Sequence, residues 1–178
     1  MDLEALFTRH LAGRIPALLA DGNAQAAVEY RFGTNDHYLG SPLLVSIEKS
    51  IAPDEGAALL YVFQRMLAAD AAFAVAGPEY PGGRAFFDRL LAYGCVSGPL
   101  LHRISTEDAQ AVLTSLFSDI LNSPECSLHR NGLPVALTVP LLQEELLQAR
   151  AFANDWNDKR YWLETADAWY FFGWSFAD

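Results

Sequence analysis

The feature of this chain that most restricts its fold is the aromatic stretch over residues 161–176. Three of the four tryptophans lie in it, and the fourth, Trp156, lies just upstream. Aromatic residues favour β-strands, and Ala166-Asp167 can serve as a two-residue turn, so the stretch is predicted to form an antiparallel hairpin. The predicted register pairs Thr165 with Ala168, Glu164 with Trp169, Leu163 with Tyr170, Trp162 with Phe171 and Tyr161 with Phe172.

Both faces of this predicted hairpin are apolar, because side chains alternate between the two faces of a strand. One face carries Trp162, Glu164, Trp169 and Phe171. The other carries Tyr161, Leu163, Tyr170, Phe172, Trp174 and Phe176. Such a hairpin should be covered on both sides. We expect the protein's own helices to cover one side, and further helix or a partner to cover the other.

Two interpretations of the face with Trp162, Glu164 and Trp169 follow from this pattern. Aromatic strands usually belong to the core, and this is the favoured interpretation. The alternative is a binding surface, because tryptophan buries a large area in an interface and keeps a polar group for hydrogen bonding.

The rest of the chain shows both strand and helix periods. Apolar residues alternate with polar ones over 26–32 and over 43–48, which predicts a second hairpin with a long loop; a short helix over 23–32 is the alternative. A short strand is predicted over 135–139. Helical spacing of apolar residues predicts helices over 2–20, 53–76, 84–93, 105–121 and 140–156.

The predicted fold class is therefore α+β. We expect a helix-rich single domain over residues 1–178, with at least five helices and a small antiparallel sheet that includes the carboxyl-terminal hairpin. A weak subdivision near residues 123–134 is the alternative, since that stretch is polar and rich in turn residues.

Composition excludes several classes of function. With 52% hydrophobic and 19% charged residues the chain has a folded composition, and its net charge of −10 argues against binding nucleic acid. The same charge suits a partner with a basic surface. The amino terminus lacks the pattern of a secretory signal, and no apolar run is long enough to span a bilayer, so a cytoplasmic location is expected.

No catalytic, metal or cofactor motif is present in the sequence. The four histidines have no metal-ligand spacing with one another or with Cys95 and Cys126. His37 and His129 fall in predicted loops, where catalytic residues often lie, but no glycine-flanked serine or paired nucleophile accompanies them. We therefore expect no cofactor and no metal, and an enzyme that uses a loop histidine is the least favoured hypothesis.

The segment that includes Trp162-Leu163-Glu164-Thr165, Trp169-Tyr170-Phe171-Phe172 and Trp174 resembles the closing hairpin of small acidic immunity proteins of bacterial toxin systems. The resemblance covers about the last 20 residues and the acidic composition. It implies a cytoplasmic protein that binds one cognate toxin and neutralises it, often by plugging its active site.

This resemblance leads to a specific functional prediction. We expect a non-enzymatic inhibitor with one protein partner, a toxin domain whose basic cleft the chain occludes, and no contact with nucleic acid or membrane. A cytoplasmic chaperone or adaptor for a secreted effector is the alternative. The predicted partner-binding residues are the aromatic groups and the neighbouring carboxylates of the hairpin: Trp162, Glu164, Asp167, Trp169 and Asp158.

Overall fold

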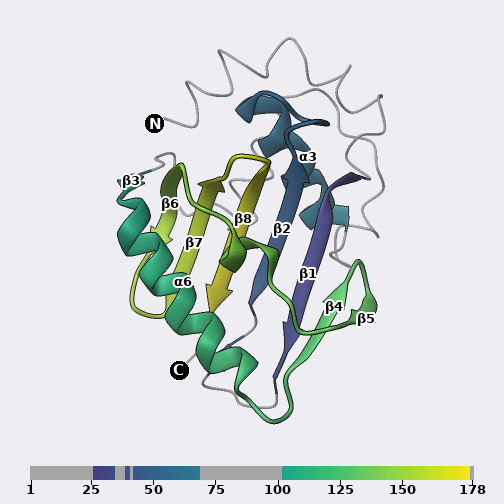
Figure 1. Ribbon diagram of the computed structural model, residues 1–178, viewed down its shortest axis with the longest axis vertical. Coiled ribbons are helices and arrows are strands. Elements are labelled where there is room, and N and C mark those ends of the chain that lie inside the picture. Colours follow the sequence, from purple (N-terminus) through teal and green to yellow (C-terminus); the bar gives the residue numbers. More distant parts are fainter. Residues whose placement is uncertain (1–25, 35–38, 41, 69–101, 177–178) are drawn as a thin grey trace.

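The computed structural model describes residues 26–34, 39–40, 42–68 and 102–176. Their centre is an eight-stranded antiparallel sheet with the strand order β3-β6-β7-β8-β2-β1-β4-β5 (Figure 1). The strands are β1 (Val28–Gly33), β2 (Leu43–Glu48), β3 (His102–Ile104), β4 (Ser127–Arg130), β5 (Leu133–Val135), β6 (Gln148–Asn154), β7 (Asp158–Glu164) and β8 (Ala168–Ser175). The helices are α3 (Glu55–Ala68), α6 (Thr106–Leu121) and the short 3-10 helix η4 (Pro140–Gln143).

The expectation of a helix-rich domain with a small sheet is wrong. The described residues are sheet-rich, with eight strands and two α-helices. The helices predicted over 2–20 and 84–93 lie outside the described residues.

The helix predicted over residues 140–156 is the main error within the described residues. Only the turn of η4 is helical, and the chain then forms β6, which pairs with β3 on one side and β7 on the other. Ala149 and Ala151 are buried on one face, whereas Gln148 and Arg150 point to the opposite face. Pairing on both edges and burial of this alternate face outweigh the helix propensity of alanine and leucine.

The polar stretch near residues 125–134 also contains a strand that the sequence pattern did not reveal. Here β4 pairs with β1, and β4 and β5 are joined by the two-residue turn Asn131-Gly132. Both turn residues have positive φ, 49° and 82°, as this tight hairpin turn requires. The short strand predicted over 135–139 begins and ends earlier, as β5.

The carboxyl-terminal hairpin is confirmed in both position and register. β7 and β8 pair Glu164 with Trp169, Leu163 with Tyr170, Trp162 with Phe171 and Tyr161 with Phe172. Thr165 closes the turn, because its backbone N–H donates to the carbonyl oxygen of Ala168 at 3.0 Å. The hairpin of residues 26–32 and 43–48 is likewise confirmed as the antiparallel pair β1–β2.

The helix predicted over 105–121 is observed as α6. The Ser105 side chain caps its start by accepting a hydrogen bond from the backbone N–H of Asp108 at 2.9 Å, and Asn122 is the cap residue at its end. The clearest predicted helix, over 53–76, is observed as α3 for its described part.

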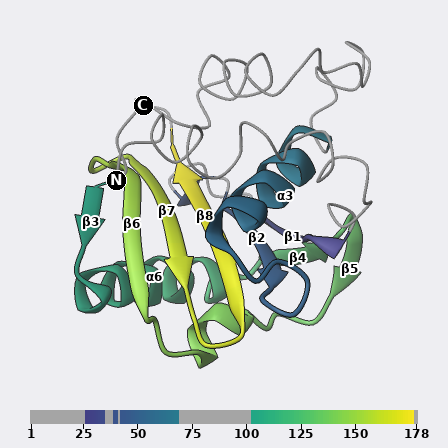
Figure 2. The ribbon, with the colours of Figure 1, turned by 90° about the horizontal axis from the view of Figure 1, so that it is seen from above.

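The sheet is covered on both faces, as the two apolar faces of the hairpin required. Figure 2 shows α6 on one side of the sheet and α3 on the other. On the α6 side, Phe117 packs against Phe172 of β8 with ring centroids 5.4 Å apart. On the α3 side, Trp162 and Trp169 lie buried against α3 and the residues that lead into it.

Replacement of Phe117 by alanine tests this arrangement, because the side chain is fully buried between α6 and the sheet. We expect Phe117→Ala to lower the free energy of unfolding by about 3–5 kcal/mol, measured by urea denaturation. Thr114→Ala, at an exposed position of the same helix, is the control and should change it by about 0.5 kcal/mol or less. Equal, small effects of both substitutions would show that α6 does not pack on the sheet through Phe117.

Candidate partner-binding surface

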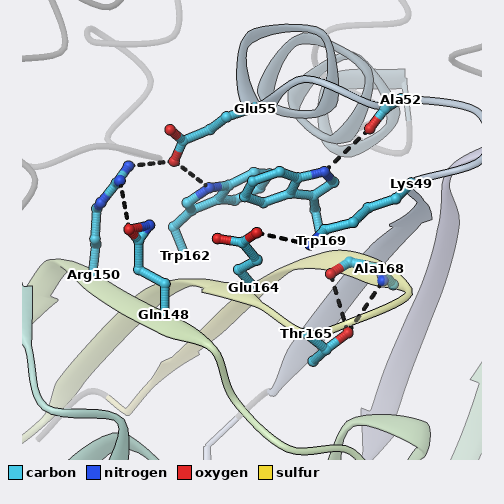
Figure 3. Close-up of polar contacts among 10 residues, drawn as sticks. All are labelled: Lys49, Ala52, Glu55, Gln148, Arg150, Trp162, Glu164, Thr165, Ala168 and Trp169. Atoms are coloured by element: carbon cyan, nitrogen blue, oxygen red, sulfur yellow. Dashed lines mark hydrogen bonds and ion pairs between the residues drawn. The ribbon is translucent and has the colours of Figure 1, made fainter.

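The predicted anchors Trp162 and Trp169 lie in the core. Their rings stack with centroids 5.9 Å apart and an interplanar angle of 13° (Figure 3). The indole N–H of Trp162 donates to Glu55 Oε1 at 3.0 Å, and that of Trp169 donates to the carbonyl oxygen of Ala52 at 3.1 Å. Only 1% and 6% of these tryptophans are exposed. The binding surface predicted from them is therefore not exposed in this structure.

Glu55 connects this tryptophan pair to β6. Its Oε1 also accepts from the Arg150 guanidinium, which in turn donates to Gln148 Oε1 at 2.9 Å (Figure 3). Burial raises the pKa of the Glu55 carboxyl, and the neighbouring Arg150 and Trp162 N–H offset only part of that effect. The network thus gives hydrogen-bond partners to the Trp162 N–H and to the Glu55 carboxylate beneath α3, which is a structural role.

The three predicted carboxylates have different surroundings. Glu164 accepts from Lys49 Nζ at 2.7 Å, and that ammonium also lies 4.9 Å from the Trp169 ring centroid. Asp158, at the opposite end of β7, accepts from Arg160 Nε at 2.9 Å. Asp167 is exposed in the β7–β8 turn. The structure brings Glu164 to the two tryptophans but places Asp158 away from them, and two of the three carboxylates already have a cationic partner.

A groove lies along α6. Its volume is about 950 Å³, and it lies between α6 and the segment after η4. Its lining consists mainly of carboxylates, hydroxyls and small side chains: Thr106, Glu107, Gln110, Ala111, Thr114, Ser115, Ser118, Asp119, Glu144, Glu145 and Leu146. Four of these residues carry a carboxylate, and none of the described lining residues is lysine or arginine. We call it the acidic groove.

Sequence reasoning missed this groove although a signal was present. The residues of α6 that line it recur at intervals of three and four, which places them on one face of the helix. The buried residues of α6 form the opposite stripe: Ala109, Leu113, Phe117 and Ile120. What the sequence could not show is that Glu144 and Glu145 lie across from this face, since they were assigned to a helix that does not form.

A smaller pocket of about 500 Å³ adjoins the acidic groove through Glu144, which lines both. Asp167 and Tyr170 also line the pocket, so it includes one residue of the predicted site. The Tyr170 hydroxyl donates to Glu144 Oε1 at 2.6 Å, whereas Glu144 Oε2 is buried and has no hydrogen-bond donor among the described residues. Burial and this hydrogen bond raise the pKa of Tyr170.

Among the described residues, the remaining candidate side chains are not brought together in either concavity. Neither concavity has a histidine among its described lining residues; His129 lies in β4, opposite Arg31 of β1, and His102 in β3 is exposed. Burial raises the pKa of the free Cys126 thiol. Within the described ranges, no three His, Cys, Asp or Glu residues are placed to hold a metal ion. His10, His37 and Cys95 lie outside those ranges.

Comparison with known proteins adds no relative. No protein-family model, curated protein or solved structure matches the chain. In the part of the chain that the structure describes, no helix has both the length and the apolar character needed to cross a membrane.

Burial of tyrosine hydroxyls makes the free energy of unfolding depend on pH in the alkaline range. Burial, with the charge of Asp108, raises the pKa of Tyr161 to about 12 from its usual 10.0. The unfolded chain therefore loses this proton first, so the stability that the neutral hydroxyl confers is present below pH 10 and declines as the pH rises from 10 towards 12.

We expect the free energy of unfolding, measured with urea, to fall less steeply between about pH 9 and about pH 11 in Tyr161→Phe than in the parent protein. Any constant loss from the missing hydrogen bond to Asn154 affects both ends of this range equally. Parallel declines in the two proteins would mean that Tyr161 ionises as readily in the folded chain as in the unfolded one.

Proposed function

We propose that this chain is a non-enzymatic binding protein that neutralises a bacterial toxin, and that it holds a basic surface of that toxin in the acidic groove along α6. The observation that supports the proposal is the lining of the groove, with four carboxylates and no cation among its described residues. The resemblance of the carboxyl-terminal hairpin to immunity proteins makes a toxin the first partner class to test.

The electrostatics of the groove favour a cationic partner. Glu107, Asp119 and Glu145 are exposed, and none has an ion-pair partner among the described residues. Their negative potential adds to that of a chain whose net charge is −10. Complementary charge accelerates the encounter of two proteins and rejects partners of the same sign. A toxin that acts on an anionic substrate would present a basic surface whose charge this groove complements.

The hydroxyl groups of the groove suit the same partner. Thr114, Ser115 and Ser118 lie along its helical wall between the carboxylates Glu107 and Asp119. Hydroxyls accept hydrogen bonds from lysine and arginine side chains without the desolvation cost of a further charge. The wall can therefore satisfy several donors of a basic segment, and the carboxylates determine the sign of the partner's charge.

The alternative, a chaperone for a secreted effector, has one observation in its favour. Leu133, Val135 and Leu137 are 70%, 40% and 44% exposed, and they form an apolar edge at β5. An extended peptide could add to such an edge by backbone hydrogen bonds. However, Pro134 occupies the position of β5 whose backbone points away from β4, and proline has no N–H to donate. The edge strand therefore resists this mode of binding, and we favour the inhibitor.

The proposal is tested by titrating the protein with the product of the adjacent gene, as the candidate toxin, at about 50 mM and about 300 mM salt. We expect a complex that weakens as the salt rises, because screening reduces the attraction between exposed charges. The absence of a complex at micromolar concentrations would contradict the proposed function.

Two neighbouring substitutions locate the contact. Glu107→Lys changes a groove residue, and Asp108→Lys makes the same charge change at an exposed residue of the same helical turn that does not line the groove. We expect Glu107→Lys to weaken binding at least about tenfold, and Asp108→Lys less than about threefold. Equal effects would indicate attraction to the whole chain instead of a contact in the groove.

A further inference from the structure

One tryptophan of this chain lies at the surface. Trp156, in the connection between β6 and β7, is 67% exposed. The other three, Trp162, Trp169 and Trp174, are at most 7% exposed. All four lie in the described residues, so this contrast holds for every tryptophan of the chain. Tryptophan is the residue most enriched at binding hot spots, and an exposed one offers a large area for contact.

The turn that carries Trp156 is held by hydrogen bonds on both sides. Asn154 Oδ1 accepts from the Tyr161 hydroxyl at 2.6 Å and from Lys159 Nζ at 3.0 Å. The carbonyl oxygen of Asn157 accepts from the backbone N–H of Phe176 at 3.2 Å. These bonds fix the residues before and after Trp156, so little conformational entropy remains to be lost when a partner binds there.

The indole itself is supported by a row of aromatic rings. Trp156 meets Phe176 with centroids 5.2 Å apart and an interplanar angle of 78°. Phe176 meets Trp174 at 5.3 Å, and the Trp174 N–H donates to the carbonyl oxygen of Leu39 at 2.7 Å. An edge-to-face contact uses at most one face of the Trp156 ring. The other face is available to a ligand.

The residue that precedes Trp156 in the chain carries a carboxylate. Asp155 is exposed and has no ion-pair partner among the described residues. Asp158 accepts from Arg160, whereas the Lys159 ammonium donates to the uncharged carbonyl and side-chain oxygens of Asn154. A cation placed over the free face of Trp156 would meet the electron-rich ring of an exposed indole, on a chain whose net charge is −10.

We propose that Trp156 and Asp155 form an anchor for one arginine or lysine side chain of the partner protein. This inference rests on the proposed function, because it takes the same basic partner as its occupant. It adds a second contact, on the β6–β7 turn, which none of the groove residues provides. Cations are attracted most strongly by the indole among aromatic rings, so the identity of the side chain at position 156 determines this contact.

The experiment uses the same titration with the product of the adjacent gene. We expect Trp156→Ala to weaken the complex at least about tenfold, and Asp155→Asn about threefold. Leu147→Ala is the matched control, because Leu147 is also a large apolar side chain with 56% exposure, and it should change the affinity less than about twofold. Thermal unfolding of each variant verifies that the exposed substitutions leave the fold intact.

Tryptophan fluorescence gives a second measurement that does not rest on affinity. Since Trp156 is the exposed indole, its burial by a partner should shift the emission of the parent protein to shorter wavelength. Trp156→Phe keeps an aromatic ring at this position and should show no such shift on saturation with the same partner.

The outcomes distinguish the two proposals. If Trp156→Ala binds as tightly as the parent while Glu107→Lys is weakened, the anchor is wrong and the proposed function stands. If the parent protein forms no complex at micromolar concentration, the proposed function is contradicted and the anchor falls with it. Loss of affinity in Trp156→Ala, together with the absent emission shift in Trp156→Phe, supports the anchor.

Discussion

The fold depends on the burial of the β7–β8 hairpin on both faces. On one face Tyr161, Tyr170 and Phe172 belong to the core cluster that includes the buried residues of α6, and on the other face Trp162 and Trp169 stack beneath α3. Trp162 and Trp169 are diagonal neighbours across the strand pair, a separation that aromatic side chains can span. Each helix therefore covers one side of the same two strands, and β6 and β2 extend the sheet from their outer edges.

The register of this hairpin was predictable because three local signals agree. A two-residue turn fixes which residues face each other, side-chain alternation assigns them to faces, and aromatic residues favour strands. The same consistency explains why β1, β2 and the start of α6 were predicted. β6 was not, because Ala149, Ala151 and Ala153 fit a helix as well as a strand until their partners on β3 and β7 are known.

The candidate binding surface was harder to predict than the fold, for a reason that the tryptophans illustrate. Trp162 and Trp156 are six positions apart and have the same intrinsic tendency to be buried, yet one is 1% and the other 67% exposed. The difference arises from distant parts of the chain: Trp162 stacks on Trp169 and donates a hydrogen bond to Glu55 of α3, which lies 107 residues earlier. The residues that neighbour Trp156 and Trp162 in the sequence do not predict such a contact. The acidic groove was hard to predict for the same reason, because its two walls, α6 and residues 144–146, are separated in the sequence.

Glu144 connects the acidic groove to the smaller pocket. It lines both the acidic groove and the pocket, and its carboxylate holds the hydroxyl of Tyr170 in the sheet. A group that draws this carboxylate into the groove changes the hydrogen bonding of the pocket wall, and an occupant of the pocket changes the carboxylate presented to the groove. An occupant that moves this carboxylate would therefore link the two concavities thermodynamically, and the linkage is reciprocal: each occupant changes the affinity of the other by the same factor.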